Sequence, residues 1–148
     1  MRSLKVTVLL SVFLLWSVTV ALAGTMVSVK GRKVNLRSGP GKRYEVLWEL
    51  GRGFPLKVIG RRKGWVKVRD FEGDEGWIAS RLVGRTPHLV VKKKRINLRS
   101  GPGKRYRLVG RANYGVVFRT LRKKRGWVKV RHENGTTGWV LRSLLWGW

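Results

Sequence analysis

Asn35-Leu-Arg-Ser-Gly-Pro-Gly-Lys-Arg-Tyr44 is the stretch that decides the fold, because it returns unchanged at Asn97–Tyr106. The offset is 62 residues, and two further blocks obey it: Gly64–Arg69 matches Gly126–Arg131, and Gly76-Trp77 matches Gly138-Trp139. Because one spacing aligns three blocks without a gap, the chain is one small module written twice. Two copies also predict avidity, since a second weak site gains strongly once the first has bound.

The first 23 residues differ in kind from the rest of the chain. Arg2 and Lys5 precede an apolar run, Val6–Val20, which ends in an Ala-x-Ala sequence before Gly24. This pattern is typical of a secretory signal peptide cleaved between Ala23 and Gly24. An uncleaved membrane anchor is the alternative, because the apolar segment approaches spanning length. We therefore expect an exported protein, placed in the periplasm, the extracellular space or the cell envelope of a bacterium.

The mature chain has room for two domains of about 55–60 residues, near the lower size limit for independent folding. We expect a first module at 24–83, a linker at 84–88, and a second module at 89–148 that ends in an apolar tail. Seven of the eight tryptophans lie beyond residue 40, so we expect aromatic packing to supply much of the stability. The short linker contains a proline, which predicts that the modules sit close together.

The local patterns of each copy predict β-structure. Val66 and Val68 alternate with Lys67 and Arg69, which is the period of a half-buried strand, and the second copy repeats the pattern. Short apolar segments at 54–59 and 116–121 are bounded by glycine, and Asn134-Gly135 is a hairpin signal. We predict an all-β protein with two tandem barrels of about five short strands each.

The charge of the chain is extreme and uneven. Residues 24–148 hold 32 basic and 7 acidic residues, a net charge of +25, and residues 84–148 carry +17 of it. Such a field attracts polyanions and weakens with salt. Export removes the chain from most nucleic acid, so nucleic acid is not an expected partner. The remaining polyanions are acidic wall glycans, lipopolysaccharide phosphates and anionic lipid headgroups.

Three motifs in a fixed order give the chain a family resemblance. Asn-Leu-Arg-Ser-Gly-Pro-Gly, a Gly-Trp-Val-Lys-Val strand and a later Gly-Trp pair resemble the bacterial SH3-like (SH3b) domain, over about Val27–Val83 and Leu89–Leu145. The resemblance implies a small β-barrel of exported proteins that often binds peptidoglycan or its peptides. It does not fix a ligand.

The repeated loop supplies the first candidate contacts. Asn35 and Asn97 are expected to anchor the loop by bonding nearby backbone, and the loop glycines to supply unusual dihedral angles. The arginines of the motif could pack on tryptophan or read an anionic group. The expected ligand-binding residues of the loop are Arg37, Lys42, Arg43 and Tyr44, with Arg99, Lys104, Arg105 and Tyr106 in the second copy. A solvated charged loop is the alternative.

The aromatic residues divide into shared and unshared positions. Trp65, Trp77, Trp127 and Trp139 recur at matched places, so we expect them to serve packing. In the repeat alignment, the second copy has Gly110 at the position of Trp48, and the first copy has Arg52 at the position of Tyr114. Because a fold does not require an aromatic that only one copy has, Trp48 and Tyr114 are candidates for ligand contact.

Catalysis finds no support in these residues. Glu133 is the only acid of the second copy, so paired carboxylates are missing there. There is no cysteine, and His88 and His132 fall at unrelated repeat positions, so neither a metal site nor a cofactor is expected. We predict a non-catalytic protein that binds peptidoglycan or another anionic envelope polymer, with the tighter site in the second copy. A cationic protein of membranes or lipopolysaccharide, with Trp146 and Trp148 at the interface, and an adaptor for a partner protein are the alternatives.

Overall fold

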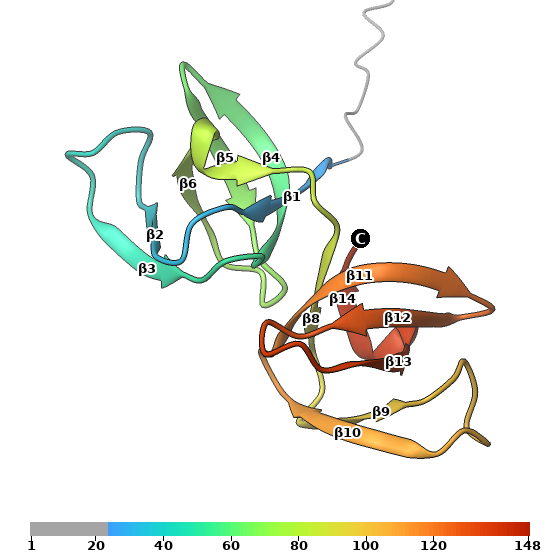
Figure 1. The fold of residues 1–148 in the computed structure, drawn as a ribbon. Coiled ribbons are helices and arrows are strands. Elements are labelled where there is room, and N and C mark those ends of the chain that lie inside the picture. The colour runs from blue at the N-terminus through green and yellow to red at the C-terminus, as the bar shows by residue number, and fades with distance from the viewer. Residues whose placement is uncertain (1–23) are drawn as a thin grey trace, which may run out of the picture.

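The structure is a computed structural model that describes residues 24–148 (Figure 1). The predicted signal peptide, with Ala23 on its side of the cleavage site, lies outside the described residues. The described part is all-β and forms two separate small barrels, which confirms the predicted class. Among residues 24–148, no helix has the length and apolar character needed to cross a membrane.

The first barrel is a seven-stranded antiparallel sheet in the order β3-β2-β6-β5-β4-β1-β7. Its elements are β1 (Met26–Val29), β2 (Val34–Arg37), β3 (Val46–Leu50), β4 (Pro55–Arg62), β5 (Trp65–Arg69), β6 (Glu75–Ala79), a 3₁₀ turn η1 (Ser80–Leu82) and β7 (Val83–Gly84). The alternating valines lie on β5, where Val66 and Val68 are buried between more exposed neighbours.

The second barrel repeats this topology in the order β10-β9-β13-β12-β11-β8-β14. Its elements are β8 (His88–Val91), β9 (Arg95–Arg99), β10 (Leu108–Asn113), β11 (Val117–Lys124), β12 (Trp127–Arg131), β13 (Thr137–Leu141), a 3₁₀ turn η2 (Arg142–Leu144) and β14 (Leu145–Gly147). Each sheet has more strands than the five expected, because short segments at both ends of each module pair with each other, β1 with β7 and β8 with β14.

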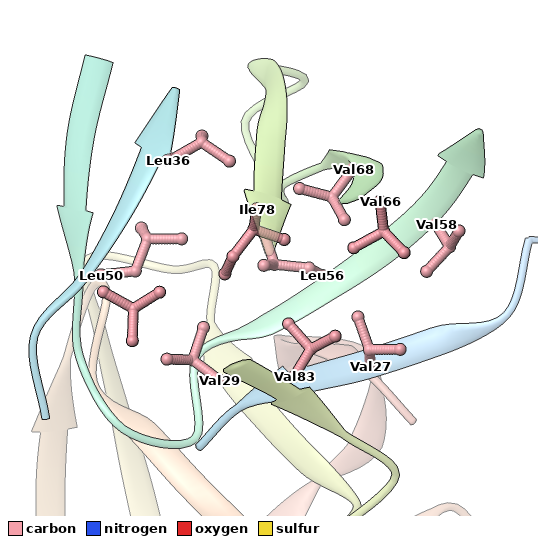
Figure 2. Close-up of a cluster of buried hydrophobic side chains, with 11 residues drawn as sticks. Val27, Val29, Leu36, Leu50, Leu56, Val58, Val66, Val68, Ile78 and Val83 are labelled. Atoms are coloured by element: carbon pink, nitrogen blue, oxygen red, sulfur yellow. The ribbon is translucent and has the colours of Figure 1, made fainter. Parts of the chain in front are cut away.

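The core of the first barrel is aliphatic rather than aromatic. Along each strand, every second side chain points into the barrel. Figure 2 shows these side chains meeting in the interior from several strands. The buried cluster consists of Val27, Val29, Val34, Leu36, Leu50, Leu56, Val58, Val66, Val68, Ile78 and Val83. The second core differs by including Phe118. Branched aliphatic side chains thus fill most of the narrow interior of each barrel, so that any aromatic contribution to stability comes mainly from tryptophans outside these two clusters.

The two barrels contact each other. Residues 85–87 connect β7 to β8, and the Ser28 hydroxyl of the first barrel donates to the Thr86 carbonyl oxygen at 2.8 Å. Strands β8 and β14 of the second barrel lie next to β4 of the first. The apolar tail thus forms an edge strand of its own barrel, and this strand also adjoins the other barrel.

Candidate functional site

The conserved geometry of the two repeated loops depends on arginine. Arg37 Nη1 donates to the carbonyl oxygens of Lys42 at 3.0 Å and of Tyr44 at 2.9 Å. Arg99 Nη1 donates to the Tyr106 carbonyl oxygen at 3.0 Å. The anchoring role expected for the two asparagines therefore belongs to the arginines, whose longer side chains span the loop, and this expectation was wrong.

Tyrosine also shapes these loops. The Tyr44 ring packs on Gly39, and the Tyr106 ring packs on Gly101 so closely that a Cβ atom at either glycine would clash with the ring. Neither glycine has a positive φ. The prediction that these glycines supply unusual dihedral angles was wrong for this reason: they are needed for the close approach of an aromatic ring.

A groove of about 630 Å³ opens beside the loop of the first barrel. Two predicted contact residues, Arg37 and Lys42, lie on its wall together with the indole of Trp65. The remaining lining residues are Lys33, Val34, Asn35, Gly64, Ala79, Ser80, Arg81 and Leu82. The groove therefore combines an aromatic face, an amide and several cations, which is a mixture that suits an amphipathic anionic ligand.

The outer face of the loop carries the other predicted residues. The Arg43 guanidinium lies over the Tyr44 ring, 5.3 Å from its centroid, which is a cation–π arrangement. Lys104, Arg105 and Tyr106 are exposed at the matching place in the second barrel. None of these five residues lines the groove.

The two unshared aromatics lie in different settings. Trp48 is 57% exposed on β3, which is the edge strand of the first sheet, and it lies outside the groove. Tyr114 contacts the other barrel: its ring lies 5.2 Å from that of Phe71, and its hydroxyl donates to the Glu72 carboxylate. This hydrogen bond raises the pKa of Tyr114 to about 12. The structure thus gives Tyr114 an interdomain contact.

The shared tryptophans occupy the barrel walls. Trp139 is buried, and Trp65, Trp77 and Trp127 are half-buried. The tryptophan of the later Gly-Trp pair is the register partner of the loop arginine in each barrel. Trp77 on β6 lies opposite Arg37 on β2, and Trp139 on β13 lies opposite Arg99 on β9.

The second barrel has a smaller hollow at the matching place. A smaller pocket of about 240 Å³ lies beside Trp127. Arg142, which replaces Ser80, donates to the carbonyl oxygens of Leu145 and Gly147 at 2.9 Å each. The larger groove therefore belongs to the first copy, although the charge balance had pointed to the second as the tighter binder.

A second hollow lies between the barrels, and sequence reasoning missed it. This interdomain cleft has a volume of about 740 Å³ and is lined from both modules. His88, which begins β8, is half-buried there, and its Nδ1 lies 2.9 Å from the Thr86 carbonyl oxygen. Burial lowers the pKa of His88, opposed by this backbone hydrogen bond. Only the folded arrangement brings the two modules together here, so no local motif could have indicated it.

The acidic turn of the first barrel is organised by its own backbone. The Asp70 carboxylate accepts hydrogen bonds from the backbone N–H groups of Glu72 and Asp74, at 2.9 Å each. Burial raises the pKa of Asp70, and these two hydrogen bonds oppose the shift. The turn therefore presents Phe71 and Glu72 to Tyr114 of the other barrel.

Comparison with known proteins places both modules in one family. Residues 30–84 and residues 92–147 each match the family described as the bacterial SH3 domain. These two ranges make up most of the chain, and they coincide with the two barrels. The chain belongs to the bacterial SH3 domain family, which confirms the resemblance drawn from the repeated motifs.

Individual relatives are more distant. The chain is 27% identical over 135 residues to the putative N-acetylmuramoyl-L-alanine amidase YrvJ of Bacillus subtilis (strain 168), a match that covers 84% of this chain and 26% of the relative. The chain thus spans about a quarter of that protein's length.

Among solved structures, an NlpC/P60 family protein from Bacillus cereus ATCC 10987 is similar at 14% identity and a TM-score of 0.39, over 82% of this chain and 55% of that one. The CBD of endolysin LysPBC5 is similar at 16% identity and a TM-score of 0.33, over 82% of this chain and 92% of that one.

Proposed function

We propose that this chain is an exported, non-catalytic protein that binds peptidoglycan or its peptide stems in the groove of the first barrel. The observation that carries the proposal is the composition of this groove, in which Trp65 lies among Asn35, Arg37 and Lys42. An indole face packs against sugar rings and aliphatic side chains, and cationic groups pair with carboxylates. Peptidoglycan stems present both kinds of surface.

Family membership and the curated relative support this ligand. The name of the Bacillus subtilis relative refers to an N-acetylmuramoyl-L-alanine bond, which is a linkage of peptidoglycan. A bacterial SH3 domain that occurs in the same chain as a wall-degrading domain is expected to bind the cell wall rather than to hydrolyse it. Holding requires no catalytic group, and the groove contains no carboxylate or histidine.

The net charge of the mature chain supports a location in the bacterial envelope. A charge of +25 concentrates the protein near anionic polymers. This attraction is long-ranged and screened by salt, whereas contacts inside a groove are screened less. The charge therefore serves capture, and the groove serves recognition.

Co-sedimentation of the mature chain with purified sacculi across a salt series tests the proposal. Lys42→Ala together with Arg81→Ala removes two cations of the groove, and Arg61→Ala together with Arg62→Ala removes two exposed cations outside it. We expect the groove variant to weaken binding by about tenfold at moderate salt and the control to stay near the wild type. Equal losses in both variants, or release of muropeptides by the wild type, would contradict the proposal.

The two alternatives give different outcomes in parallel assays. A membrane-associated protein would float with anionic liposomes in a flotation assay and would not co-sediment with sacculi. An adaptor would retain one partner protein at high salt. Trp146 belongs to β14, and the Gly147 carbonyl is held by Arg142, so the structure commits this tail to the barrel.

A further inference from the structure

The interdomain cleft is strongly cationic. Its basic side chains come from β11, from β12, from the connection between the barrels and from the turns that follow β1 and β3. These are Lys30, Arg52, Arg85, Arg119 and Arg131, whereas Glu133 is the only acidic residue of its wall. The cleft also holds His88 and His132. Its volume of about 740 Å³ exceeds what a single small ion occupies.

Two of these arginines form an unfavourable pair. Arg119 on β11 and Arg131 on β12 are direct partners in the antiparallel register. Like charges placed directly opposite on neighbouring strands repel each other. Among residues 24–148, neither guanidinium donates a hydrogen bond, and neither has a carboxylate within 4.0 Å.

In the first barrel a carboxylate offsets part of the same charge. There the matching pair is Lys57 and Arg69, also opposite in register. Glu75 pairs with the arginine of this pair, since its Oε1 accepts from Arg69 Nε at 2.9 Å. Its Oε2 lies 3.2 Å from the Nζ of a further cation, Lys67. The hydrogen bond from Arg69 lowers the pKa of Glu75, so the carboxylate remains an anion.

The second barrel has no carboxylate at the matching position. The repeat offset places Thr137 where the first copy has Glu75, and each residue pairs with its arginine in the same register. Thr137 carries no charge, and among residues 24–148 no carboxylate, that of Glu133 included, lies within 4.0 Å of the Arg119 or Arg131 guanidinium. An external anion would take the place that Glu75 fills in the first barrel.

We propose that the interdomain cleft is a binding site for a phosphate group carried by a larger molecule. In the first barrel one oxygen of the Glu75 carboxylate accepts from Arg69, and the other lies beside Lys67. A phosphate presents more oxygens and more charge, and it can accept paired hydrogen bonds from two arginines at once. The remaining volume takes the groups attached to the phosphate. This site is separate from the groove beside Trp65 and does not depend on the ligand of that groove.

Calorimetric titration with inorganic pyrophosphate tests this site. The wild type is compared with a variant that carries a carboxylate at the position matching Glu75. Thr137→Glu places an acid at the position of Glu75, on an exposed residue of β13. Arg61→Thr, on the hairpin between β4 and β5, changes the net charge by the same amount away from the cleft. We expect one pyrophosphate per wild-type chain, a loss of affinity of about tenfold or more in Thr137→Glu, and little change in Arg61→Thr.

The site would be refuted by equal weakening in the two variants, or by absence of binding to the wild type. If Thr137→Glu does not fold by circular dichroism, Arg131→Gln replaces it under the same criteria. A second arm identifies the source of the phosphate, using vesicles with and without phosphatidylglycerol. Vesicle binding that Thr137→Glu abolishes indicates a lipid headgroup, and pyrophosphate binding without vesicle binding indicates a soluble polymer.

Discussion

Tyr44 and Tyr106 each close a loop by lying flat against a glycine, so the smallest residue and one of the largest form a single unit. The loop arginine completes this unit from the other side through its bonds to backbone carbonyl oxygens. At the residue scale, therefore, the repeated decapeptide is a structural device that positions Lys42 at the groove.

Replacement of the loop glycine should be costly. Gly39→Ala forces Tyr44 out of its place, and we expect a loss of about 1–3 kcal/mol of unfolding free energy, as for overpacked sites. Gly51→Ala is the matched control, because no atom lies within 4 Å of a Cβ there. We expect it to be neutral or to stabilise by up to about 1 kcal/mol. Urea unfolding followed by tryptophan fluorescence gives both values, and equal effects would contradict the argument.

The half-buried side chain of His88 predicts a pH dependence of stability. The pKa of His88 is lower in the folded state than its ordinary value because burial disfavours the cation, and the neighbouring Arg119 adds to this effect. The unfolded chain therefore binds the proton first, so the contribution of His88 is complete above the ordinary pKa of histidine, about 6.5. It is lost as the pH falls through the lowered value.

This dependence can be measured by urea unfolding between pH 7.5 and pH 5. We expect the wild type to lose more unfolding free energy over this range than His88→Gln, which cannot titrate. Parallel curves for the two proteins would exclude His88 as the origin.

At the scale of elements, the β4–β5 and β11–β12 hairpins carry backbone strain. Each turn has two residues, Lys63-Gly64 and Arg125-Gly126, and both residues of each pair have positive φ. Such a turn matches the twist of the strands but favours asparagine before glycine. Lys63 and Arg125 are the only non-glycine residues with positive φ in the described part of the chain.

Asparagine at these positions should therefore stabilise the protein. We expect Lys63→Asn and Arg125→Asn each to add about 0.5–1 kcal/mol, since asparagine tolerates the left-handed region better than long side chains. Thermal unfolding of the two variants provides the test. Valine at the same positions serves as the opposite control and should destabilise, whereas a neutral result for both changes would contradict the assignment of strain.

The elements also show what the sequence could predict. The period-two valines identified β5 and β12, because one buried face leaves a clear signature. The offset of the repeat then carried each prediction to the other copy. The terminal pairs escaped prediction because β1, β7, β8 and β14 have two to four residues and little alternation. Two residues of the groove, Arg37 and Lys42, belong to the repeated loop motif and could be named as candidates from the sequence. Arg81 belongs to no motif, so the sequence did not indicate it.

For the whole molecule, the relation between the barrels rests on a small set of contacts. The Tyr114 ring packs at a tilt against Phe71, and its hydroxyl bonds to Glu72. The Ser28 hydroxyl bonds to the linker. The partners of Tyr114 are 42 and more residues away in the sequence, so only the folded chain reveals its role. The same packing shapes the cleft that Arg119 and Arg131 line.

Loss of this contact should free the barrels. We expect Tyr114→Ala to shorten the rotational correlation times of both barrels in ¹⁵N relaxation measurements. Tyr114→Phe removes the hydrogen bond but keeps the ring, so we expect a smaller change. If Tyr114→Ala tumbles like the wild type, the contact does not hold the barrels together.

Chemical-shift mapping of the ¹⁵N-labelled mature chain with soluble muropeptides tests the central claim most directly. The account predicts that the Trp65 indole, the Asn35 amide and the backbone near Arg81 shift together and saturate, with shifts that persist in moderate salt. It predicts no comparable response at the Trp127 indole. Shifts that follow the exposed lysines and arginines of both barrels and vanish with salt would contradict it.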